Sequence, residues 1–338
     1  MGEAKFLVVR LGSLGDIVHT FPAVAALRES FPLAKIVWLT HARWRCLVTT
    51  SGLASEIWDV ETRSFASVRQ ALSKISREKF STAIDYQGLW KSAALPFLAR
   101  VPRRIGYSSI AVREAGVPLL YTDRIDGYAA HVAEKNGELS LAAGAAKPVG
   151  AFTLAIPAAA KASVEDLLRG KGIQKYVVLS PGGGWVSKCW PAERFGELAR
   201  RLFDERGMSS VINYGPGEEG LAHRVVDVAG PAAAFPYSGS FGELMALLQG
   251  AECVVAGDTG PLHLADALGA RVVAIFGPTD PARNGPYLGQ QAAGKATVLR
   301  VKNVVPTYKR EDAPHASLLQ ISVDDVFSSL SGAKQLHE

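Results

Sequence analysis

Short apolar runs alternate with stretches of helical spacing along almost the whole chain. The runs predict strands, and apolar residues three and four apart between them predict helices. Strands are expected at residues 5–11, 34–40, 56–60, 80–88, 175–180, 209–214, 251–257 and 270–277, and helices at 17–32, 67–79, 191–207 and 262–269. Such alternation indicates an α/β protein with parallel sheets covered by helices on both faces.

The alternation is interrupted between residues 142 and 161, where Ala, Gly and Pro dominate. We interpret this segment as the connection between two domains, in agreement with a length of 338 residues and a prior of ~150 residues per domain. The expected division is residues 1–150, residues 151–321, and a C-terminal helix and tail at 322–338 with Ser322 as the helix cap.

Glycine-rich stretches follow the predicted strands at residues 12–15, 182–184, 215–217, 257–260 and 277. Ligands of open α/β sheets bind outside the carboxyl ends of the strands, so two such sheets facing each other would form a cleft lined by these loops. The loops carry neither a dinucleotide fingerprint nor a Walker phosphate-binding sequence.

One of these loops joins a buried strand to a helix in the stretch "GDTGPLHLADALG", residues 257–269. Asp258, Thr259 and Gly260 then lie where the free N–H groups of a helix start point outward, which is a site suited to an anion such as phosphate. The alternative is a simple N-cap, in which Asp258 or Thr259 accepts from the first helical amides.

Composition narrows the class of protein. The chain is 48% hydrophobic and 20% charged, as in globular proteins, and no apolar run reaches the ~20 residues of a membrane span. The N-terminal apolar run is too brief for an export signal, so a cytoplasmic protein is expected. Three separated cysteines without a CxxC pair argue against zinc and disulfides.

Positive charge is concentrated in the first half of the chain. Residues 1–160 carry 19 Lys and Arg against 13 Asp and Glu, whereas residues 161–338 carry 18 against 19. The asymmetry predicts an anionic partner for the first half. Nucleic acid is not expected, because no helix-turn-helix, zinc-finger or RRM signature and no dense basic tract is present.

Four stretches together resemble the lipopolysaccharide heptosyltransferases of glycosyltransferase family 9, with type I the more similar subtype. They are "RLGSLGDIVHTFPAVAAL", "DYQGLWKSA", "PGGGWVSKCWPAERF" and "GDTGPLHLADALG" continuing to "FGPTDPARNGPY", and the resemblance extends from Phe6 to Tyr287. It implies a GT-B fold, in which two Rossmann-like domains face each other across a cleft. The N-terminal domain would bind the acceptor and the C-terminal domain the nucleotide-sugar.

The resemblance also implies a reaction. L-glycero-D-manno-heptose would move from ADP-heptose to Kdo of Kdo2-lipid A with inversion, without a metal and without a cofactor. The alternatives are a type II or III heptosyltransferase with another core acceptor, and a non-catalytic nucleotide-sugar-binding protein. The presence of both Asp16 and Lys188 disfavours the non-catalytic alternative.

Two residues carry the implied chemistry. Asp16 matches the family's general base, which takes the proton of the acceptor hydroxyl; the alternative is an acid that merely stabilises a helix start. Lys188 matches the lysine that contacts the donor phosphate, and the alternative is an ordinary surface lysine.

The remaining candidates divide between donor and acceptor. The loop at Gly183 and Gly184 is expected to offer amides to the donor, Glu219 (or Glu218) to accept from ribose hydroxyls, and Asp258 to contact heptose hydroxyls, while Thr259 and Gly260 hold phosphate. His263 is either a donor ligand or structural. The acceptor candidates are Ser13, Gly15, Gln87, Lys91, Arg113 and His131, with Lys91 suited to a Kdo carboxylate.

Such an acceptor stays in the membrane. We therefore expect a monomeric enzyme that binds the cytoplasmic face of the inner membrane peripherally, through basic segments around residues 63–79 and 100–113.

Overall fold

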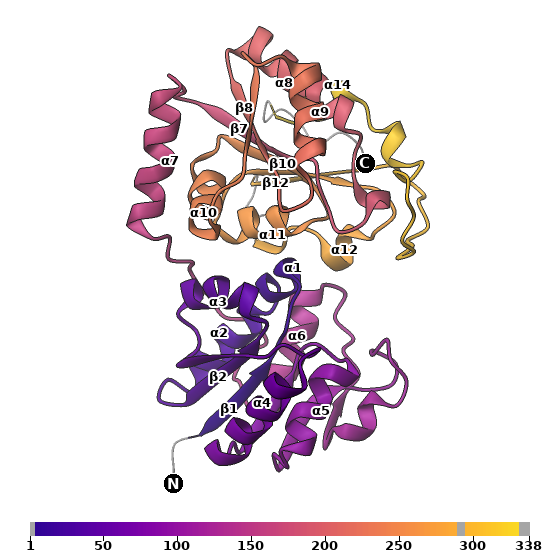
Figure 1. Cartoon of the computed structure of the whole chain (residues 1–338). Helices are drawn as coiled ribbons and strands as arrows, with labels where there is room; N and C mark the ends of the chain where they lie inside the picture. The colour runs from indigo at the N-terminus through magenta and orange to yellow at the C-terminus, as the bar shows by residue number, and fades with distance from the viewer. Residues whose placement is uncertain (1–3, 289–294, 331–338) are drawn as a thin grey trace. The chain divides into compact units, whose positions relative to one another are not determined.

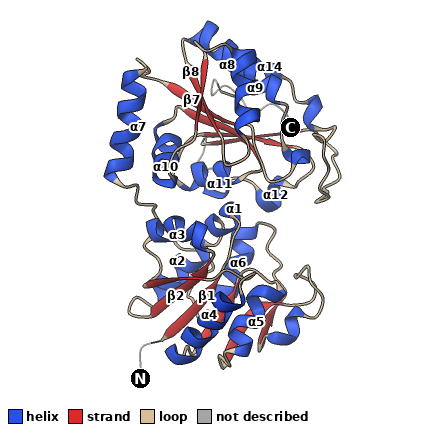
Figure 2. Cartoon of the chain, viewed as in Figure 1, coloured by secondary structure: helices blue, strands red, loops and turns tan. Residues whose placement is uncertain are grey.

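The chain divides into two compact units, Met1–Ala155 and Ile156–Glu338. The structure, a computed structural model, describes residues 4–288 and 295–330. Figure 1 follows the chain through the N-terminal unit and then the C-terminal unit. Each unit is built around its own parallel sheet (Figure 2).

The N-terminal unit contains a six-stranded parallel sheet of order β3-β2-β1-β4-β5-β6. Its strands are β1 (Lys5–Val9), β2 (Lys35–Thr40), β3 (Glu56–Asp59), β4 (Thr82–Asp85), β5 (Arg103–Tyr107) and β6 (Asp123–Ile125). Its helices are α1 (Leu14–Val18), α2 (Phe21–Ser30), η1 (Ala42–Trp44), α3 (Arg45–Ser51), α4 (Phe65–Glu78), α5 (Trp90–Leu98), η2 (Val117–Leu120) and α6 (Val132–Ala142).

The core of this unit surrounds the central strand β1. Leu7 is opposite Val37 of β2 and Ala83 of β4, and all three are buried in one cluster with residues of α4 and α5. Full burial of a leucine or valine side chain such as Leu7 or Val37 contributes about 1.5–3 kcal/mol. Helices α2 and α6 pack on each other, and Phe21 of α2 contacts Trp38 of β2, which points to the opposite face of the sheet from Val37. The predicted α/β layering is confirmed.

The C-terminal unit repeats this topology in a sheet of order β12-β11-β10-β7-β8-β9. Its strands are β7 (Tyr176–Ser180), β8 (Ser209–Asn213), β9 (Ala234–Tyr237), β10 (Cys253–Gly257), β11 (Val272–Phe276) and β12 (Ala296–Arg300). Its helices are α7 (Ala158–Gly170), η3 (Val186–Lys188), α8 (Ala192–Arg206), α9 (Glu219–Ala229), α10 (Phe241–Gly250), α11 (Gly260–Ala267), α12 (Pro281–Asn284), η4 (Leu318–Gln320) and α14 (Val323–Ser329).

In both sheets the chain order reverses next to the first strand, between β1 and β4 and between β7 and β10. This is the strand order of Rossmann folds, whose ligands bind at the switch point beyond the carboxyl ends of the strands. The loops after β1, β7 and β10 are therefore the places to look for a site.

Two local predictions had different outcomes. The single helix expected at residues 17–32 is wrong, because α1 and α2 are separate and the chain turns at His19 and Thr20. Pro22 lies in the first turn of α2, where its missing N–H costs nothing. The Ser322 cap is confirmed, since Asp325 N donates to Ser322 Oγ (3.1 Å). The end of the expected tail, residues 331–338, lies outside the described residues.

Candidate active site

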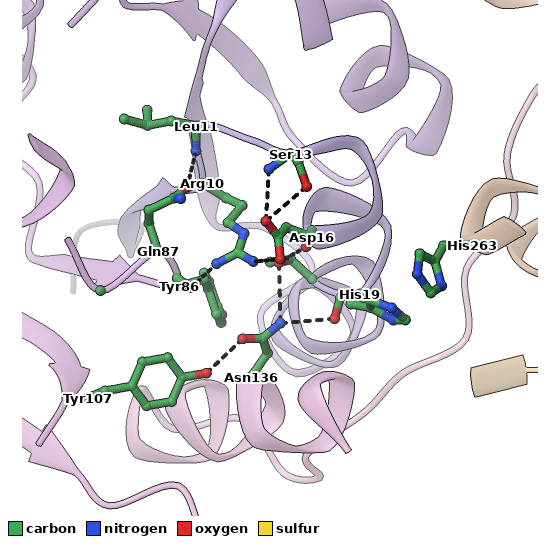
Figure 3. Close-up of polar contacts among 12 residues, drawn as sticks. Arg10, Leu11, Ser13, Asp16, His19, Tyr86, Gln87, Tyr107, Asn136 and His263 are labelled. Carbon is green, nitrogen blue, oxygen red and sulfur yellow. Dashed lines mark hydrogen bonds and ion pairs between the residues drawn. The ribbon is translucent and has the colours of Figure 1, made fainter. Parts of the chain in front are cut away.

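Asp16 lies in the first turn of α1, in the loop region that follows β1. Its Oδ2 atom accepts hydrogen bonds from Ser13 N (2.9 Å) and Ser13 Oγ (3.0 Å), as Figure 3 shows. Its carbonyl oxygen accepts from Thr20 Oγ1 (2.8 Å) at the turn between α1 and α2. The side chain is 44% exposed, so a fixed carboxylate still has an accessible side.

Arg10 is the partner that the sequence analysis missed. Its Nη2 lies 2.8 Å from Asp16 Oδ1, and its Nη1 donates to the carbonyl oxygen of Tyr86, beside β4 (Figure 3). The Arg10 side chain is almost fully buried. Partial desolvation by the surrounding protein raises the pKa of Asp16, but Arg10 and the two Ser13 hydrogen bonds outweigh it and hold that pKa below its usual value.

This geometry keeps Asp16 ionised at neutral pH, as a general base requires. Asp16 is also a first-turn helix acid, so both sequence interpretations describe its position. A helix acid alone, however, needs no buried arginine on its other oxygen.

The other acceptor candidates in the N-terminal unit lie in different environments. Gln87 Oε1 accepts from Leu11 N (3.0 Å) and so fixes the loop after β1, while Gly15 is buried within α1. Lys91 and Arg113 are exposed. His131 caps α6, because its Nδ1 accepts from Ala133 N (3.1 Å).

Asp85, at the end of β4, is a second carboxylate near this loop, but it is buried. It accepts from Tyr121 Oη (2.7 Å), Ser92 Oγ (2.9 Å) and Gln87 N (2.9 Å). Burial nevertheless raises the pKa of this carboxyl group. Asp85 therefore ties β4 to the start of α5 and holds Gln87 in place.

In the C-terminal unit, Asp258 lies between two basic side chains. Lys188 Nζ is 2.8 Å from Asp258 Oδ2, and His263 Nε2 is 3.2 Å from Oδ1. Asp258 and His263 are buried, and the Lys188 side chain is only 16% exposed. Burial raises the pKa of Asp258, but the His263 hydrogen bond and the Lys188 charge outweigh it and hold the pKa well below its usual value.

Two of the simpler sequence alternatives are wrong. Lys188 is not an ordinary surface lysine, because it reaches inward to Asp258 and lies 4.7 Å from the centre of the Trp185 ring. The N-cap interpretation fails as well. Thr259 occupies the cap position of α11 but makes no side-chain cap hydrogen bond, and the Asp258 oxygens are taken by Lys188 and His263.

The Thr259 hydroxyl is buried at the first turn of α11. Among the described residues it has no hydrogen-bond partner. A buried hydroxyl without a partner costs free energy, which a bound ligand would recover. Gly260 follows as the first residue of α11.

The glycine loop after β7 lies against the same turn. A Cβ atom at Gly183 would meet Thr259 Cγ2 at 3.0 Å, whereas one at Gly184 would meet nothing within 4 Å. A Cβ atom at Gly182 would clash with the Glu218 carboxylate. The Glu218 carboxylate, which also accepts from Gly215 N (2.9 Å), therefore lies between the glycine loops at Gly182 and Gly215. Glu219 is exposed at the start of α9.

Within residues 4–288 and 295–330, no group of three or more His, Cys, Asp or Glu side chains is arranged to hold a metal ion. In the same ranges no helix is long and apolar enough to cross a bilayer.

Comparisons with known proteins identify the family of the chain. The pattern of "Glycosyltransferase family 9 (heptosyltransferase)" matches residues 68–311. Lipopolysaccharide heptosyltransferase 1 of Escherichia coli O18:K1:H7 is 28% identical over 332 residues, covering 93% of this chain and all of the relative.

Solved structures give the same result for the fold. The E. coli ADP-heptose lps heptosyltransferase II matches with a TM-score of 0.81 at 21% identity, covering 97% of each chain. The E. coli heptosyltransferase WaaC, solved with ADP-2-deoxy-2-fluoro heptose, matches with a TM-score of 0.74 at 25% identity and covers 98% of this chain and 100% of that one. The GT-B fold with two Rossmann-like domains is confirmed. With a family match over most of its length, the chain belongs to glycosyltransferase family 9 and is a lipopolysaccharide heptosyltransferase homologue.

Proposed function

We propose that this protein is an inverting, metal-independent heptosyltransferase that moves L-glycero-D-manno-heptose from ADP-heptose to Kdo of Kdo2-lipid A. The observation that carries the proposal is the Asp16 carboxylate, held ionised by Arg10 and Ser13 and 44% exposed. An inverting transfer needs one such base beside the acceptor.

In the proposed reaction Asp16 takes the proton of a Kdo hydroxyl. The hydroxyl oxygen bonds to the anomeric carbon of the heptose while the bond from that carbon to the ADP oxygen breaks, and ADP leaves with the electron pair. General-base assistance of this kind contributes about 10²–10⁴-fold to the rate. The Arg10 guanidinium pairs with the Asp16 carboxylate and keeps this base ionised before the transfer.

The diphosphate of the donor is assigned to the first turn of α11. Phosphate oxygens there would accept from the Gly260 amide and from the Thr259 hydroxyl, which is otherwise unpartnered in the described structure. Lys188 would divide its charge between Asp258 and the phosphates. Together a helix N-terminus and a buried ammonium group would stabilise the negative charge that develops on the leaving ADP.

The rest of the donor is assigned to neighbouring side chains. Glu218, rather than Glu219, would accept from the ribose hydroxyls, because its carboxylate lies beside the glycine loops at Gly182 and Gly215. Asp258 would accept from heptose hydroxyls, with His263 fixing its other oxygen. Gly183 and Gly184 would offer amides to the phosphates. The WaaC structure with ADP-2-deoxy-2-fluoro heptose supports an ADP-heptose donor for a protein of this fold.

The acceptor is assigned to the N-terminal unit. Ser13, Gly15 and Gln87 shape the loop around Asp16, and the exposed Lys91 and Arg113 suit the carboxylates of Kdo. His131 is buried and caps α6, so its contribution would be to shape the unit rather than to contact the sugar. The enzyme would work as a monomer at the cytoplasmic face of the inner membrane, where donor and lipid-linked acceptor meet.

One experiment tests this function. The purified protein is incubated with ADP-heptose and Kdo2-lipid A, and the acceptor is analysed by mass spectrometry. A gain of one heptose is expected, with activity retained after exhaustive chelation by EDTA. Absence of transfer to any core acceptor would overturn the proposal.

The second candidate is a type II enzyme, which would use an acceptor that already carries heptose. The match with heptosyltransferase II over 97% of each chain is the reason to test it. The same assay with heptosylated Kdo2-lipid A separates the two. Transfer only to the heptosylated acceptor would assign the chain to type II.

A further inference from the structure

Helix α5 is apolar on two opposite sides. Its inward side buries Ala93 and Leu95 in the N-terminal unit. Its outward side exposes Trp90 (47%), Phe97 (42%) and Leu98 (61%). Residues seven and eight apart lie on one side of a helix, so these three form one exposed face.

The 3-10 helix η2 extends this face. Its Val117 is buried together with Ala93 of α5, while its Leu119 is 70% exposed. The Trp90 ring covers Gly116, where a Cβ atom would come within 2.9 Å of the indole. We call the set Trp90, Phe97, Leu98 and Leu119 the α5 face. Four large exposed apolar side chains on two packed elements, unlike a single exposed leucine, indicate a binding surface.

The charge around the α5 face is almost entirely positive. Residues 89–120 contain five Lys and Arg and one acid, Glu114. Lys91, Arg100 and Arg113 are exposed, and the Arg104 guanidinium lies 5.5 Å from the centre of the Phe97 ring. Glu114 Oε2 is used locally, since it accepts from the Trp90 amide (2.7 Å).

Two basic residues of the segment 100–113 are used within the fold. Arg103 pairs with Asp123 (2.8 Å) and Arg104 donates to the Leu120 carbonyl oxygen (2.8 Å), so both hold the fold together. Their charge reversal would test folding as much as binding. Arg100, just beyond α5, is exposed and is the better probe.

Large aromatic and aliphatic side chains beside Lys and Arg are the composition of surfaces that bind the interface of an anionic bilayer. A second protein with an acidic rim would match the charge, but tryptophan together with leucine and phenylalanine at one helix face favours lipid. We propose that the α5 face inserts into the headgroup region of an anionic lipid bilayer while Arg100 at its rim contacts the lipid phosphates.

The location of α5 gives the docking a consequence. Because α5 follows β4, its Trp90 end lies at the carboxyl edge of the sheet, and β4 is the parallel neighbour of β1, which leads to Asp16. Docking through α5 would bring this edge close to the headgroups. This consequence rests on the proposed function, since it concerns a lipid-linked acceptor, whereas the docking itself does not.

The test is co-sedimentation with vesicles of phosphatidylcholine, with and without phosphatidylglycerol. The double variant Leu98→Ser/Leu119→Ser should bind the anionic vesicles at least about tenfold more weakly than the unsubstituted protein. Arg100→Glu should weaken binding by about fivefold or more at low salt, and high salt should release the unsubstituted protein. The matched control is Leu33→Ser/Val305→Ser, which removes two even more exposed apolar side chains elsewhere (80% and 82% exposed) and should bind normally.

Three results would overturn the proposal. They are unsubstituted protein that does not sediment with anionic vesicles, a double variant that binds as well as its parent, and a control variant that loses as much binding. A dimer of the unsubstituted protein that the double variant dissociates would also assign the face to a second copy rather than lipid.

Transfer of heptose to a Kdo glycoside without acyl chains separates this proposal from the proposed function. The double variant should keep the unsubstituted rate with that acceptor, because none of its changes touches the site. Loss of vesicle binding with this activity retained supports the docking surface. If no variant or parent transfers heptose, the function fails while the vesicle result still decides the docking.

Discussion

Lys188 Nζ lies 2.8 Å from Asp258 Oδ2, although the two residues are 70 positions apart in the chain. One comes from η3, after β7, and the other from the end of β10, and these strands are parallel neighbours. The sheet therefore brings together a buried acid and the cation assigned to the donor. Before a donor binds, Asp258 holds the lysine in place and the lysine keeps the carboxylate charged.

Substitution of Lys188 by Met should be costly because it leaves a buried carboxylate short of one partner. We expect a loss of about 3 kcal/mol in the free energy of unfolding, measured in urea at neutral pH. The double variant Lys188→Met/Asp258→Asn should recover at least half of that loss. The loss should also shrink as pH falls, since protonation of Asp258 removes the uncompensated charge. A double variant less stable than the single one would contradict the pairing as the cause.

Replacement of Thr259 by Val should affect binding and stability in opposite directions. The hydroxyl has no partner in the described structure, so a methyl group of the same shape should leave the melting temperature unchanged or slightly higher. Loss of a hydrogen bond to a charged phosphate should weaken ADP binding by about tenfold or more, as calorimetry would measure.

The matched control for Thr259 is Thr40→Val, which removes another buried hydroxyl without a partner among the described residues, in the other unit. It should leave ADP affinity unchanged. Equal ADP affinity of the Thr259 variant and its parent would remove the hydroxyl from the phosphate site.

The sequence predicted those parts of the fold that depend on local pattern. The central strands predicted from the sequence are apolar throughout because both faces of a parallel sheet are covered. The glycine loops were recognised because they directly follow these apolar runs. Among the edge strands, β3 was expected at residues 56–60, but β6, β9 and β12 were not. β6 is only "DRI" and β9 contains Pro236, so neither has the apolar run that burial on two faces produces.

Site residues that lie within one sequence motif could be predicted. Contacts between residues on different strands could not. Asp16 lies within one continuous sequence motif, and residues 257–269 form another. The pairing of Arg10 with Asp16 depends on the Tyr86 carbonyl oxygen beside β4, and that of Lys188 with Asp258 depends on the β7–β10 register. Residues separated by 70 or more positions carry no local sign of such contacts.

Asp16→Asn should abolish most of the transfer reaction. The amide keeps the size of the side chain but cannot take a proton, so kcat should fall by at least about 100-fold. Donor affinity should change little, because the proposed donor residues are all in the C-terminal unit. The measurement is steady-state kinetics with ADP-heptose together with calorimetry of ADP binding. Turnover near that of the unsubstituted enzyme would leave Asp16 as a helix acid only.

Arg10→Met should change the pH dependence of the same reaction. Arg10 lowers the pKa of Asp16, so in the unsubstituted enzyme the base stays ionised down to below the ordinary aspartate pKa of about 3.9. The same depressed pKa stabilises the fold above that ordinary value, and this stabilisation is lost as pH falls through the folded-state pKa. Without the guanidinium the pKa of Asp16 rises, and the acid limb of the kcat/KM profile should move to higher pH.

Arg10→Lys should restore most of the original limb because it keeps the charge. The control is Arg28→Met, which removes a partly buried arginine bonded to the Ala34 and Leu53 carbonyl oxygens in the same unit and should not move the limb. An unshifted limb in Arg10→Met would mean that Arg10 acts only through the Tyr86 carbonyl oxygen, by holding β4 to the end of β1.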